Sequence, residues 1–335
     1  MALLVDRVTK RFGPVLALDA LAFEVGPGSV FGFLGANGAG KTTTMRIALG
    51  VVRPDDGDIR WAGRSTRELP RATFGYLPEE RGLYHRMTVI DQLVYFGRLY
   101  GLPTDLARRE ARAWLARFHA ADLADRRAEE LSKGNQQKIQ FVAAILHDPA
   151  VLLMDEPFTG LDPVNVSMLR EAFLELRDRG KTLVFSTHQM ETVETLCEAV
   201  AIIDRGRLVV SGPIRDVRRA TGRRALRLGF DRPGPTAWLA QLPGVRVVRP
   251  GSDEVELALD PEIEPKAVLA AAIDRGIGVR HFEVAEPSLE QIFIERVGRP
   301  ASDEATLGAP EAEDADVAGG PVPDARPDAR PGAAG

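Results

Sequence analysis

A glycine-rich loop between a predicted strand and a predicted helix constrains the fold of this chain more than any other feature. The apolar run Val30–Leu34 leads directly into Gly35-Ala36-Asn37-Gly38-Ala39-Gly40-Lys41-Thr42, and a helical stretch follows over Thr43–Leu49. Glycines let backbone N–H groups turn toward bound phosphates, and the dipole of the following helix adds a favourable field. Lys41 is placed to reach the β- and γ-phosphates of a nucleoside triphosphate, and the Thr42 hydroxyl to bind Mg²⁺. The sequence therefore predicts an α/β fold with a phosphate-binding P-loop.

A second predicted strand ends in two carboxylates. The apolar residues Val151–Met154 are followed at once by Asp155 and Glu156. Charge at the tip of a buried strand needs a cation, and Mg²⁺ would supply it. We expect Asp155 to bind the metal, directly or through water, and Glu156 to orient or deprotonate the attacking water. A solvated Asp-Glu turn is the plain alternative, which the accompanying P-loop disfavours.

The charge of the chain is balanced except at its C-terminal end. The 335 residues include 48 acidic and 43 basic side chains, of which eight and three fall within residues 298–335, so residues 1–297 carry 40 of each sign. A neutral body argues against a nucleic-acid partner, because gripping a phosphate backbone needs a basic surface. Cys197 is the only cysteine, which excludes an intrachain disulfide and a cysteine-based zinc site.

Three regions differ in composition. Residues 1–218 mix short apolar strands with helices, and the stretch of about 88–147 is mostly helical, with helices expected over Asp91–Leu99, Asp105–Phe118 and Gln136–Leu146. Residues 298–335 contain six Pro, six Gly and ten Ala but no aromatic residue, which predicts a disordered acidic tail. The apolar runs fall far short of the ~20 residues that span a bilayer, so no membrane span is expected.

Residues 222–297 are predicted to form a second, smaller domain. Their expected order of strand, helix, strand, strand, helix, strand, with helices at Trp238–Leu242 and Pro265–Asp274, is typical of a small ferredoxin-like α+β domain. Ser288 and Gln291 fit a capping box that begins a closing helix. The closing helix carries one apolar stripe, which we expect to pack on the sheet of its own small domain: Leu289, Ile292, Phe293 and Val297.

Three more motifs accompany the P-loop and the strand that ends in Asp155 and Glu156. Leu131-Ser132-Lys133-Gly134-Asn135-Gln136-Gln137 stands between the two phosphate elements, and Gly160-Leu161-Asp162 and Ser186-Thr187-His188 follow them. Across residues 2 to about 218, the five motifs together resemble the ATP-binding subunit of an ABC transporter. The resemblance implies a P-loop NTPase of the ABC cassette type, with a mixed sheet core and a helical subdomain. It also implies ATP hydrolysis that powers a separate transmembrane permease.

The resemblance also assigns roles to matching positions. Ser132 and Gly134 would touch the γ-phosphate held by an opposite subunit, so the resemblance implies a second ATP-binding subunit as a partner, which we expect to be an identical copy. Phe12 would stack on the adenine of ATP, with an ordinary core Phe as the alternative. His188 would hydrogen-bond the γ-phosphate and join Lys41 and Glu156 as a catalytic residue. The residues that the resemblance and the P-loop together assign to nucleotide binding are Phe12, Gly35, Ala36, Asn37, Gly38, Ala39, Gly40, Lys41, Thr42, Thr43, Ser132, Gly134 and Asp162.

Two departures from the family pattern point to a subfamily. The usual glutamine after the predicted strand Phe74–Leu77 is replaced by Glu79, which could still join Thr42 and Asp155 in binding Mg²⁺ or water. Lys133 and Asn135 replace the commoner Gly and Gln. Exporter subunits of the sodium-extrusion and antibiotic-resistance branch carry similar text and append a similar C-terminal domain, for which a dimer contact and a regulatory surface both stay open. An exporter subunit at the cytoplasmic face of the cell membrane is therefore expected.

Two other functions fit the sequence less well. A soluble ABC-type ATPase acting on ribosomes or DNA is disfavoured, because this chain has neither a second cassette nor long coiled-coil insertions. A nucleotide-binding regulator that does not hydrolyse ATP is disfavoured by Glu156 and His188, which such a protein would not need.

Overall fold

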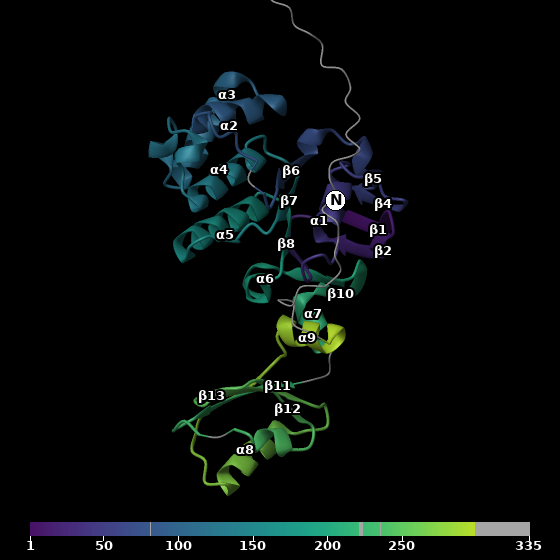
Figure 1. The fold of residues 1–335 in the computed structure, drawn as a ribbon, viewed down its shortest axis with the longest axis vertical. Coiled ribbons are helices and arrows are strands. Elements are labelled where there is room, and N and C mark those ends of the chain that lie inside the picture. The colour runs from purple at the N-terminus through teal and green to yellow at the C-terminus, as the bar shows by residue number, and fades with distance from the viewer. Residues whose placement is uncertain (81, 221–223, 235, 299–335) are drawn as a thin grey trace, which may run out of the picture.

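Two sheets meet beside the glycine-rich loop in the computed structural model, which describes residues 1–80, 82–220, 224–234 and 236–298 (Figure 1). Arg81 and the predicted tail beyond Gly298 lie outside the described residues. The first sheet is antiparallel, with the strand order β2 (Val15–Val25), β1 (Leu3–Phe12), β4 (Asp56–Trp61) and β5 (Arg64–Ser65). The second sheet has the order β10 (Arg207–Pro213), β9 (Ala199–Asp204), β3 (Val30–Leu34), β8 (Thr182–Thr187), β7 (Val151–Asp155) and β6 (Phe74–Leu77). Only β10 runs antiparallel to its neighbour in this second sheet.

The second sheet separates two apolar cores. In β3, Val30 and Leu34 contribute to one core, whereas Phe31 and Phe33 contribute to the other. Successive side chains of a strand point to opposite faces, so a strand that is apolar throughout can fill both cores. All five residues of β3 and of β7 are buried, as expected of parallel strands covered on both faces. The mixed sheet core predicted from the sequence is thus confirmed.

Seven helices and their caps complete the N-terminal part, residues 1–220. They are α1 (Lys41–Ala48), α2 (Val89–Leu99), α3 (Thr104–Arg117), α4 (Lys133–Ile145), α5 (Pro163–Asp178), α6 (Met190–Leu196) and α7 (Ile214–Arg219). The four helices predicted here, α1 to α4, all begin one to three residues earlier than their apolar patterns predict, and two of them have a side-chain cap at the observed start. The Thr88 hydroxyl caps α2 by accepting from the Asp91 N–H at 3.3 Å, and the Ser132 hydroxyl caps α4 by accepting from the Asn135 N–H at 3.3 Å. Capping residues, rather than apolar spacing, fix where a helix starts.

The C-terminal sheet has the strand order of a ferredoxin-like fold. Its strands and helix are β11 (Arg224–Phe230), β12 (Val245–Arg249), β13 (Glu254–Leu259), α8 (Pro265–Asp274) and β14 (Val279–Ala285). The order β12-β13-β11-β14 is antiparallel throughout. The predicted helix at Trp238–Leu242 is wrong in extent, because only a 3₁₀ turn, η5 (Leu239–Gln241), forms there. Leu242 precedes Pro243 and is extended, with φ −75° and ψ 130°, since a residue before proline avoids the α region.

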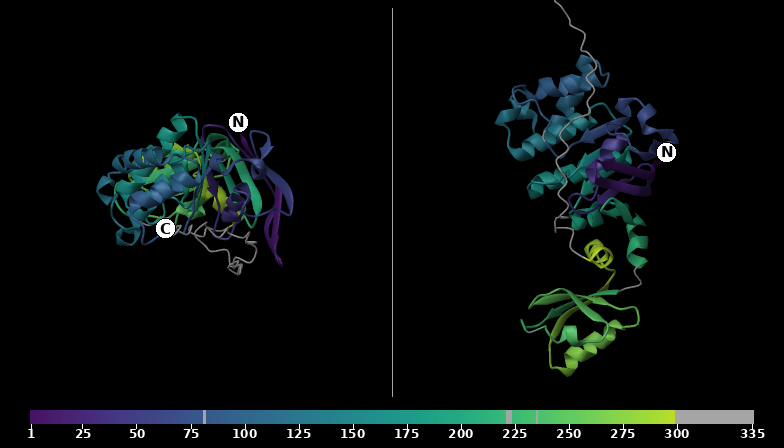
Figure 2. Two further views of the ribbon diagram at one scale, coloured as in Figure 1. Left: turned by 90° about the horizontal axis from the view of Figure 1, so that it is seen from above. Right: turned by 45° about the vertical axis from the view of Figure 1, so that its right-hand side comes forward.

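The closing helix α9 (Leu289–Val297) packs on the N-terminal part, so the prediction that it packs on its own sheet is wrong. The capping box at Ser288 and Gln291 is present as predicted. Leu289, Ile292 and Phe293, however, belong to the core that contains α4, α5 and α6, not to the core of the C-terminal sheet. Figures 1 and 2 show α9 beside α6 and α7, apart from the C-terminal sheet.

A carboxylate on α6 anchors the start of α9. Glu194 Oε1 accepts a hydrogen bond from the Leu289 N–H at 2.5 Å and lies 3.0 Å from Arg218 Nη2 of α7. The C-terminal sheet is packed against α8 and η5, which contribute residues such as Val268 and Leu239 to its core. The stripe of α9 is therefore free to join the other core.

Replacing Phe293 by Ala is expected to destabilise the N-terminal part by about 3–5 kcal/mol, because the Phe293 ring is completely buried in that core. Calorimetry should show a lower midpoint for the unfolding transition that MgADP stabilises. Leu257→Ala is the matched control, because Leu257 is equally buried but belongs to the core of the C-terminal sheet. A Phe293→Ala protein in which that transition is unchanged would contradict the packing of α9.

No helix in the described part of the chain is long and apolar enough to cross a membrane.

Candidate ATP site

The P-loop joins β3 to α1 and encloses the side chain of Lys41. Lys41 Nζ donates to the carbonyl oxygens of Gly35 at 2.7 Å and Ala36 at 3.2 Å. Burial lowers the pKa of Lys41, although the negative charges of Glu156, Asp155 and Glu79 act in the opposite direction. The ammonium group is therefore held in the mouth of the loop, where a phosphate oxygen could replace the carbonyls.

Gly40 shows why the loop needs glycine. Its φ is +106°, and a Cβ atom there would lie 2.6 Å from Leu18 Cδ2 and 2.8 Å from the carbonyl oxygen of Ala17. Both the left-handed backbone and the close approach of β2 exclude a side chain. The turn delivers Lys41 and Thr42 to the first turn of α1, beside the end of β7.

Asp155 lies at the buried end of β7 and binds two hydroxyl groups. The Thr42 Oγ1 hydroxyl donates to Asp155 Oδ2 at 2.5 Å, and the Ser186 hydroxyl donates to Asp155 Oδ1. Asp155 and Ser186 are also register partners on the parallel strands β7 and β8. A carboxylate beside a threonine hydroxyl is an all-oxygen set, which is what Mg²⁺ prefers, so these residues fit the expected metal. The described residues contain no group of three or more His, Cys, Asp or Glu side chains that would hold a metal on their own.

Glu156 and His188 are brought into direct contact. His188 Nδ1 lies 3.0 Å from Glu156 Oε1, and the hydroxyls of Thr159 and Thr187 each donate to Glu156 Oε2 at 3.2 Å. The Glu156 side chain is 7% exposed and that of His188 is 39% exposed. Two threonine hydroxyls and one histidine therefore fix the Glu156 carboxylate, and solvent reaches that histidine. This arrangement suits a general base next to a polar group that can face a phosphate.

Glu79 follows β6, the edge strand beside β7. Partial desolvation, and then the negative charges of Asp155 and Glu156, raise the pKa of Glu79. Burial also raises the pKa of Tyr76, the last residue but one of β6 and also near Asp155, to about 12. Three carboxylates therefore act electrostatically on one another and on Lys41, and a bound cation nearby would relieve their repulsion.

Replacing Glu79 by Gln is expected to stabilise the ligand-free protein at neutral pH by about 1 °C in melting temperature. A raised pKa means that the folded state disfavours the charged form, so stability falls as pH rises through the folded-state pKa. The gain from Glu79→Gln should therefore vanish in acid, where Glu79 is protonated in both states. Scanning fluorimetry from pH 4 to 8 measures this, with Glu24→Gln on β2 as the control. A gain that is equal at all pH values would argue against repulsion at Glu79.

Phe12 lies on the surface at the end of β1, which excludes the alternative of a core Phe. The residue is 37% exposed, and Lys10 Nζ lies 5.2 Å from its ring centroid. Asp55 holds that lysine at 3.1 Å and accepts from the Arg11 N–H at 2.6 Å. These hydrogen bonds lower the pKa of Asp55. The exposed Phe12 ring lies at the end of β1, which Asp55 holds in place, and such a ring could stack on a nucleotide base.

Gly134 and Asp162 both lie next to Asn165, and Ser132 caps the helix that contains Gly134. Asp162 caps α5 by accepting from the Asn165 N–H at 3.0 Å, a hydrogen bond that lowers the pKa of Asp162. A Cβ atom on Gly134 would lie 3.0 Å from Asn165 Nδ2, so α4 and α5 meet at these residues. Within the described residues, no hydrogen bond links Ser132 or Gly134 to the loop 35–42. The structure therefore does not place these residues at the same site as Lys41.

Four residues of the site are not among those that the sequence predicts. Ser186 and Thr187 belong to the Ser-Thr-His motif. Their roles follow from the pairing of β8 with β7, and this pairing cannot be read from a single sequence. Thr159 follows Glu156 by three residues. Gln137 Nε2 donates to the carbonyl of Pro157 at 3.2 Å and ties α4 to the carboxylate strand end. Its signal was its place in the motif that begins at Leu131.

The chain matches known protein families over most of its length. Residues 18–159 match the ABC transporter family, and residues 212–297 match the family described as ATP-binding protein DrrA1-3-like, C-terminal domain. The ABC transporter ATP-binding protein YhaQ of Bacillus subtilis (strain 168) is 44% identical over 296 residues, which are 88% of this chain and 98% of that protein. The linearmycin resistance ATP-binding protein LnrL of the same organism is 31% identical over 89% of this chain and 99% of its own length.

A solved structure described as the ATP-binding subunit of an ABC transporter superimposes with a TM-score of 0.62 at 31% identity, covering 66% of this chain and 94% of that one. The fold and the site define a P-loop ATPase of the cassette type. The chain belongs to the family of ABC transporter ATP-binding proteins, which hydrolyse ATP to power transport.

Proposed function

We propose that this chain is the ATP-hydrolysing subunit of an exporter and acts through a separate transmembrane permease. The observation that carries the proposal is the convergence of Lys41, Asp155 and Glu156 at the carboxyl ends of two nearby parallel strands, with His188 following a third between them. The resistance function in the name of LnrL supports the exporting direction.

Hydrolysis requires that water attack the γ-phosphorus in line with the bond that breaks to ADP. Glu156 would accept a proton from the attacking water, and the hydroxyls of Thr159 and Thr187 would hold its carboxylate in place. Lys41 would exchange the carbonyls of Gly35 and Ala36 for phosphate oxygens, which places its charge where negative charge develops. His188 would move from Glu156 Oε1 to the γ-phosphate while remaining close to the water.

Mg²⁺ would be held by the Thr42 hydroxyl and by Asp155, directly or through water, with Glu79 at the edge of the same site. When bound, it neutralises the charge of the β- and γ-phosphate oxygens. The chain's own contribution is to keep the Asp155 carboxylate buried and oriented by the Ser186 hydroxyl.

A second copy of the chain would complete each ATP site. The Ser132 cap begins a helix of 13 residues, and Gly134 lies in its first turn. The N-terminus of such a helix attracts an anion through its dipole and its free N–H groups. Because no hydrogen bond within the described residues links them to their own P-loop, a head-to-tail pair, in which each α4 faces the partner's γ-phosphate, would give them a ligand.

An aromatic cluster on the surface is the proposed contact for the permease. Tyr84, Tyr95 and Phe96 have ring centroids 5.7–5.9 Å apart, and Tyr84 and Tyr95 are 48% and 41% exposed. Tyr84 lies on the same segment as Glu79, and Gln140 of α4 donates to the carbonyl of Glu80 at 3.1 Å. A permease segment bound to this cluster would place the chain at the cytoplasmic face of the membrane. The short segment between Glu79 and Tyr84 would then connect the permease contact to the ATP site.

The permease contact is tested by the double substitution Tyr84→Ala with Tyr95→Ala. We expect co-purification of the tagged chain with its membrane partner to fall about tenfold or more, because exposed aromatic anchors dominate such contacts. ATP binding by the isolated chain should be unchanged. Val51→Ala, another exposed apolar residue, is the control. Full recovery of the membrane partner with the double variant would rule out this surface.

A further inference from the structure

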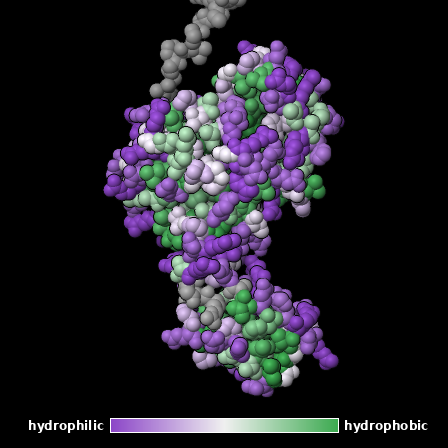
Figure 3. Space-filling model, turned by 180° about the vertical axis from the view of Figure 1, so that it is seen from behind, coloured by the Kyte–Doolittle hydropathy of each residue, from purple (hydrophilic) through white to green (hydrophobic). Residues whose placement is uncertain are grey.

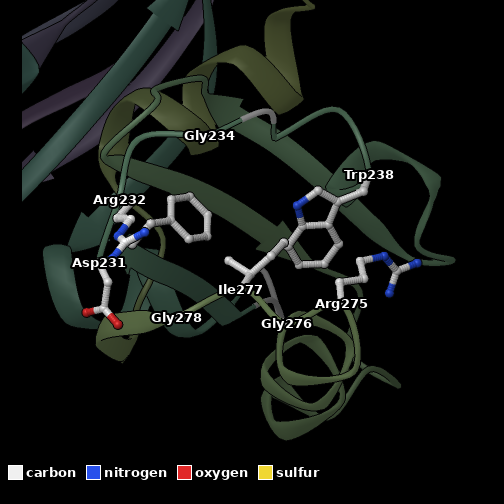
Figure 4. A pocket seen from close by; sticks show the side chains of 9 residues that line it. Asp231, Arg232, Gly234, Trp238, Arg275, Gly276, Ile277 and Gly278 are labelled. Carbon is white, nitrogen blue, oxygen red and sulfur yellow. The ribbon is translucent and has the colours of Figure 1, made fainter.

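The C-terminal sheet carries a cavity of about 600 Å³ far from the ATP site. The cavity lies between the end of β11, the loop that leads to η5, and the turn between α8 and β14 (Figure 4). It exists because the first crossover of this fold is a loop and one 3₁₀ turn instead of a helix. A helix of several turns would cover that half of the sheet face. The volume is within the range of small-molecule sites.

The cavity has an apolar lining. Phe230 belongs to the core of the C-terminal sheet, and Trp238 and Ile277 pack against that core while remaining partly exposed. In Figure 4 the side chains of Trp238 and Ile277 point toward each other across the cavity. Figure 3 shows apolar side chains gathering on this small domain, whereas its junction with the rest of the molecule is hydrophilic. An apolar body of a ligand would therefore be desolvated here.

One buried donor at the cavity has no partner. The Trp238 Nε1–H is buried and forms no hydrogen bond within the described residues. In Figure 4 the nitrogen edge of the indole faces the side of the cavity on which Arg232 and Asp231 lie. A buried N–H group is normally satisfied. An acceptor atom of a bound molecule would satisfy this one.

Two guanidinium groups give the cavity positive charge. Arg275 lies 5.0 Å from the Trp238 ring centroid and donates to the carbonyl of Ala271 at 2.9 Å. Within the described residues, neither Arg275 nor Arg232 is paired with a carboxylate. Asp231, the one acidic residue of the lining, lies against the backbone of Gly278, where a Cβ atom would come within 2.2 Å of Asp231 Oδ2. Its carboxylate points away from Trp238 in Figure 4.

We propose that this cavity binds a small organic anion with a flat apolar body. The body would lie between Phe230, Ile277 and the Trp238 ring. Its anionic group would accept from the Trp238 N–H and face Arg232 and Arg275. The site belongs to the C-terminal sheet alone and uses no residue of the ATP site.

A matched pair of fluorescent probes tests the apolar and the anionic part of the proposal separately. 1-Anilinonaphthalene-8-sulfonate has an apolar body and a sulfonate, and N-phenyl-1-naphthylamine has the same body without charge. Binding to the full chain is titrated with saturating MgADP, which occupies the ATP site. We expect one sulfonate probe per chain, bound about tenfold more tightly than the neutral probe through two weak ion pairs.

The variants locate the site. Arg232→Gln and Arg275→Gln should each weaken binding of the sulfonate probe about threefold to fivefold and leave the neutral probe unaffected. Lys266→Gln, which removes an exposed charge from the same domain on α8, is the matched control. Trp238→Phe keeps an aromatic ring but removes the N–H donor. It should weaken binding of the sulfonate probe more than binding of the neutral probe.

Filling the cavity with Ile277→Trp should abolish binding of both probes. Circular dichroism and thermal melts verify that each variant is folded, and Trp238→Phe carries the test if Ile277→Trp does not fold. The proposal is overturned if the two probes bind equally well to the wild-type chain, or if none of the four substitutions changes their binding.

Discussion

Replacing Glu156 by Gln is expected to lower ATP turnover about 10²–10⁴-fold while leaving ATP binding intact. The Glu156 carboxylate is buried, and Thr159, Thr187 and His188 hold its two oxygens. Glutamine has the same size but cannot accept the proton of the attacking water. The variant should therefore stop after ATP has closed the pair of subunits and before the bond to the γ-phosphate breaks.

Size-exclusion chromatography with MgATP measures this arrest. The Glu156→Gln chain should elute as a dimer that persists, whereas the wild-type dimer should be lost as ATP is consumed. Glu79→Gln is the control, because Glu79 is a carboxylate near Asp155, Glu156 and Lys41 but lies at the edge of the site. If Glu79→Gln lost more activity than Glu156→Gln, the main base would have been assigned to the wrong carboxylate.

Replacing Lys41 by Ala is expected to remove measurable ATP binding and, with it, turnover. Lys41 is the cation inside the P-loop, and its substitution leaves Asp155, Glu156 and Glu79 around that space with no lysine among them. The loss of one such preorganised charge reduces rates by about 10²–10³-fold, and the added repulsion of the ATP phosphates should weaken binding further.

Titration calorimetry with MgATP measures the loss at Lys41. Lys181→Ala is the matched control, because Lys181 pairs with Asp148 at 2.8 Å on the surface between α5 and β8. Normal ATP hydrolysis by Lys41→Ala would contradict the assignment of the phosphate loop.

Local sequence was sufficient to predict the elements whose characteristic residues lie close together in the chain. The loop 35–42 and the strand end at Asp155 were predicted because glycine spacing, apolar runs and adjacent charges lie within about ten residues of each other. The contact between Glu156 and His188 was not predicted, because it depends on the register of β7 with β8 across 31 intervening positions.

The sequence of an amphipathic helix also does not reveal which surface its apolar face packs against. The stripe on α9 showed that one face would be buried, but not that the burying surface would be α6 and its neighbours. Likewise, apolar spacing at Trp238–Leu242 predicts a helix, whereas only one 3₁₀ turn forms there and Leu242, before Pro243, is extended. That shortening also opened the cavity beside Trp238, so the same local effect removed a helix and left room for a ligand.

Phosphate release by the purified full chain tests the central claim most directly, namely that the P-loop and Glu156 act on one bound ATP. The rate is followed with ATP in the presence and absence of Mg²⁺, for the wild-type chain and for Glu156→Gln. The wild-type chain should release phosphate only with Mg²⁺, and Glu156→Gln should release almost none although it binds ATP. Equal rates for the two proteins, or a wild-type chain that binds MgATP and releases no phosphate, would contradict the claim.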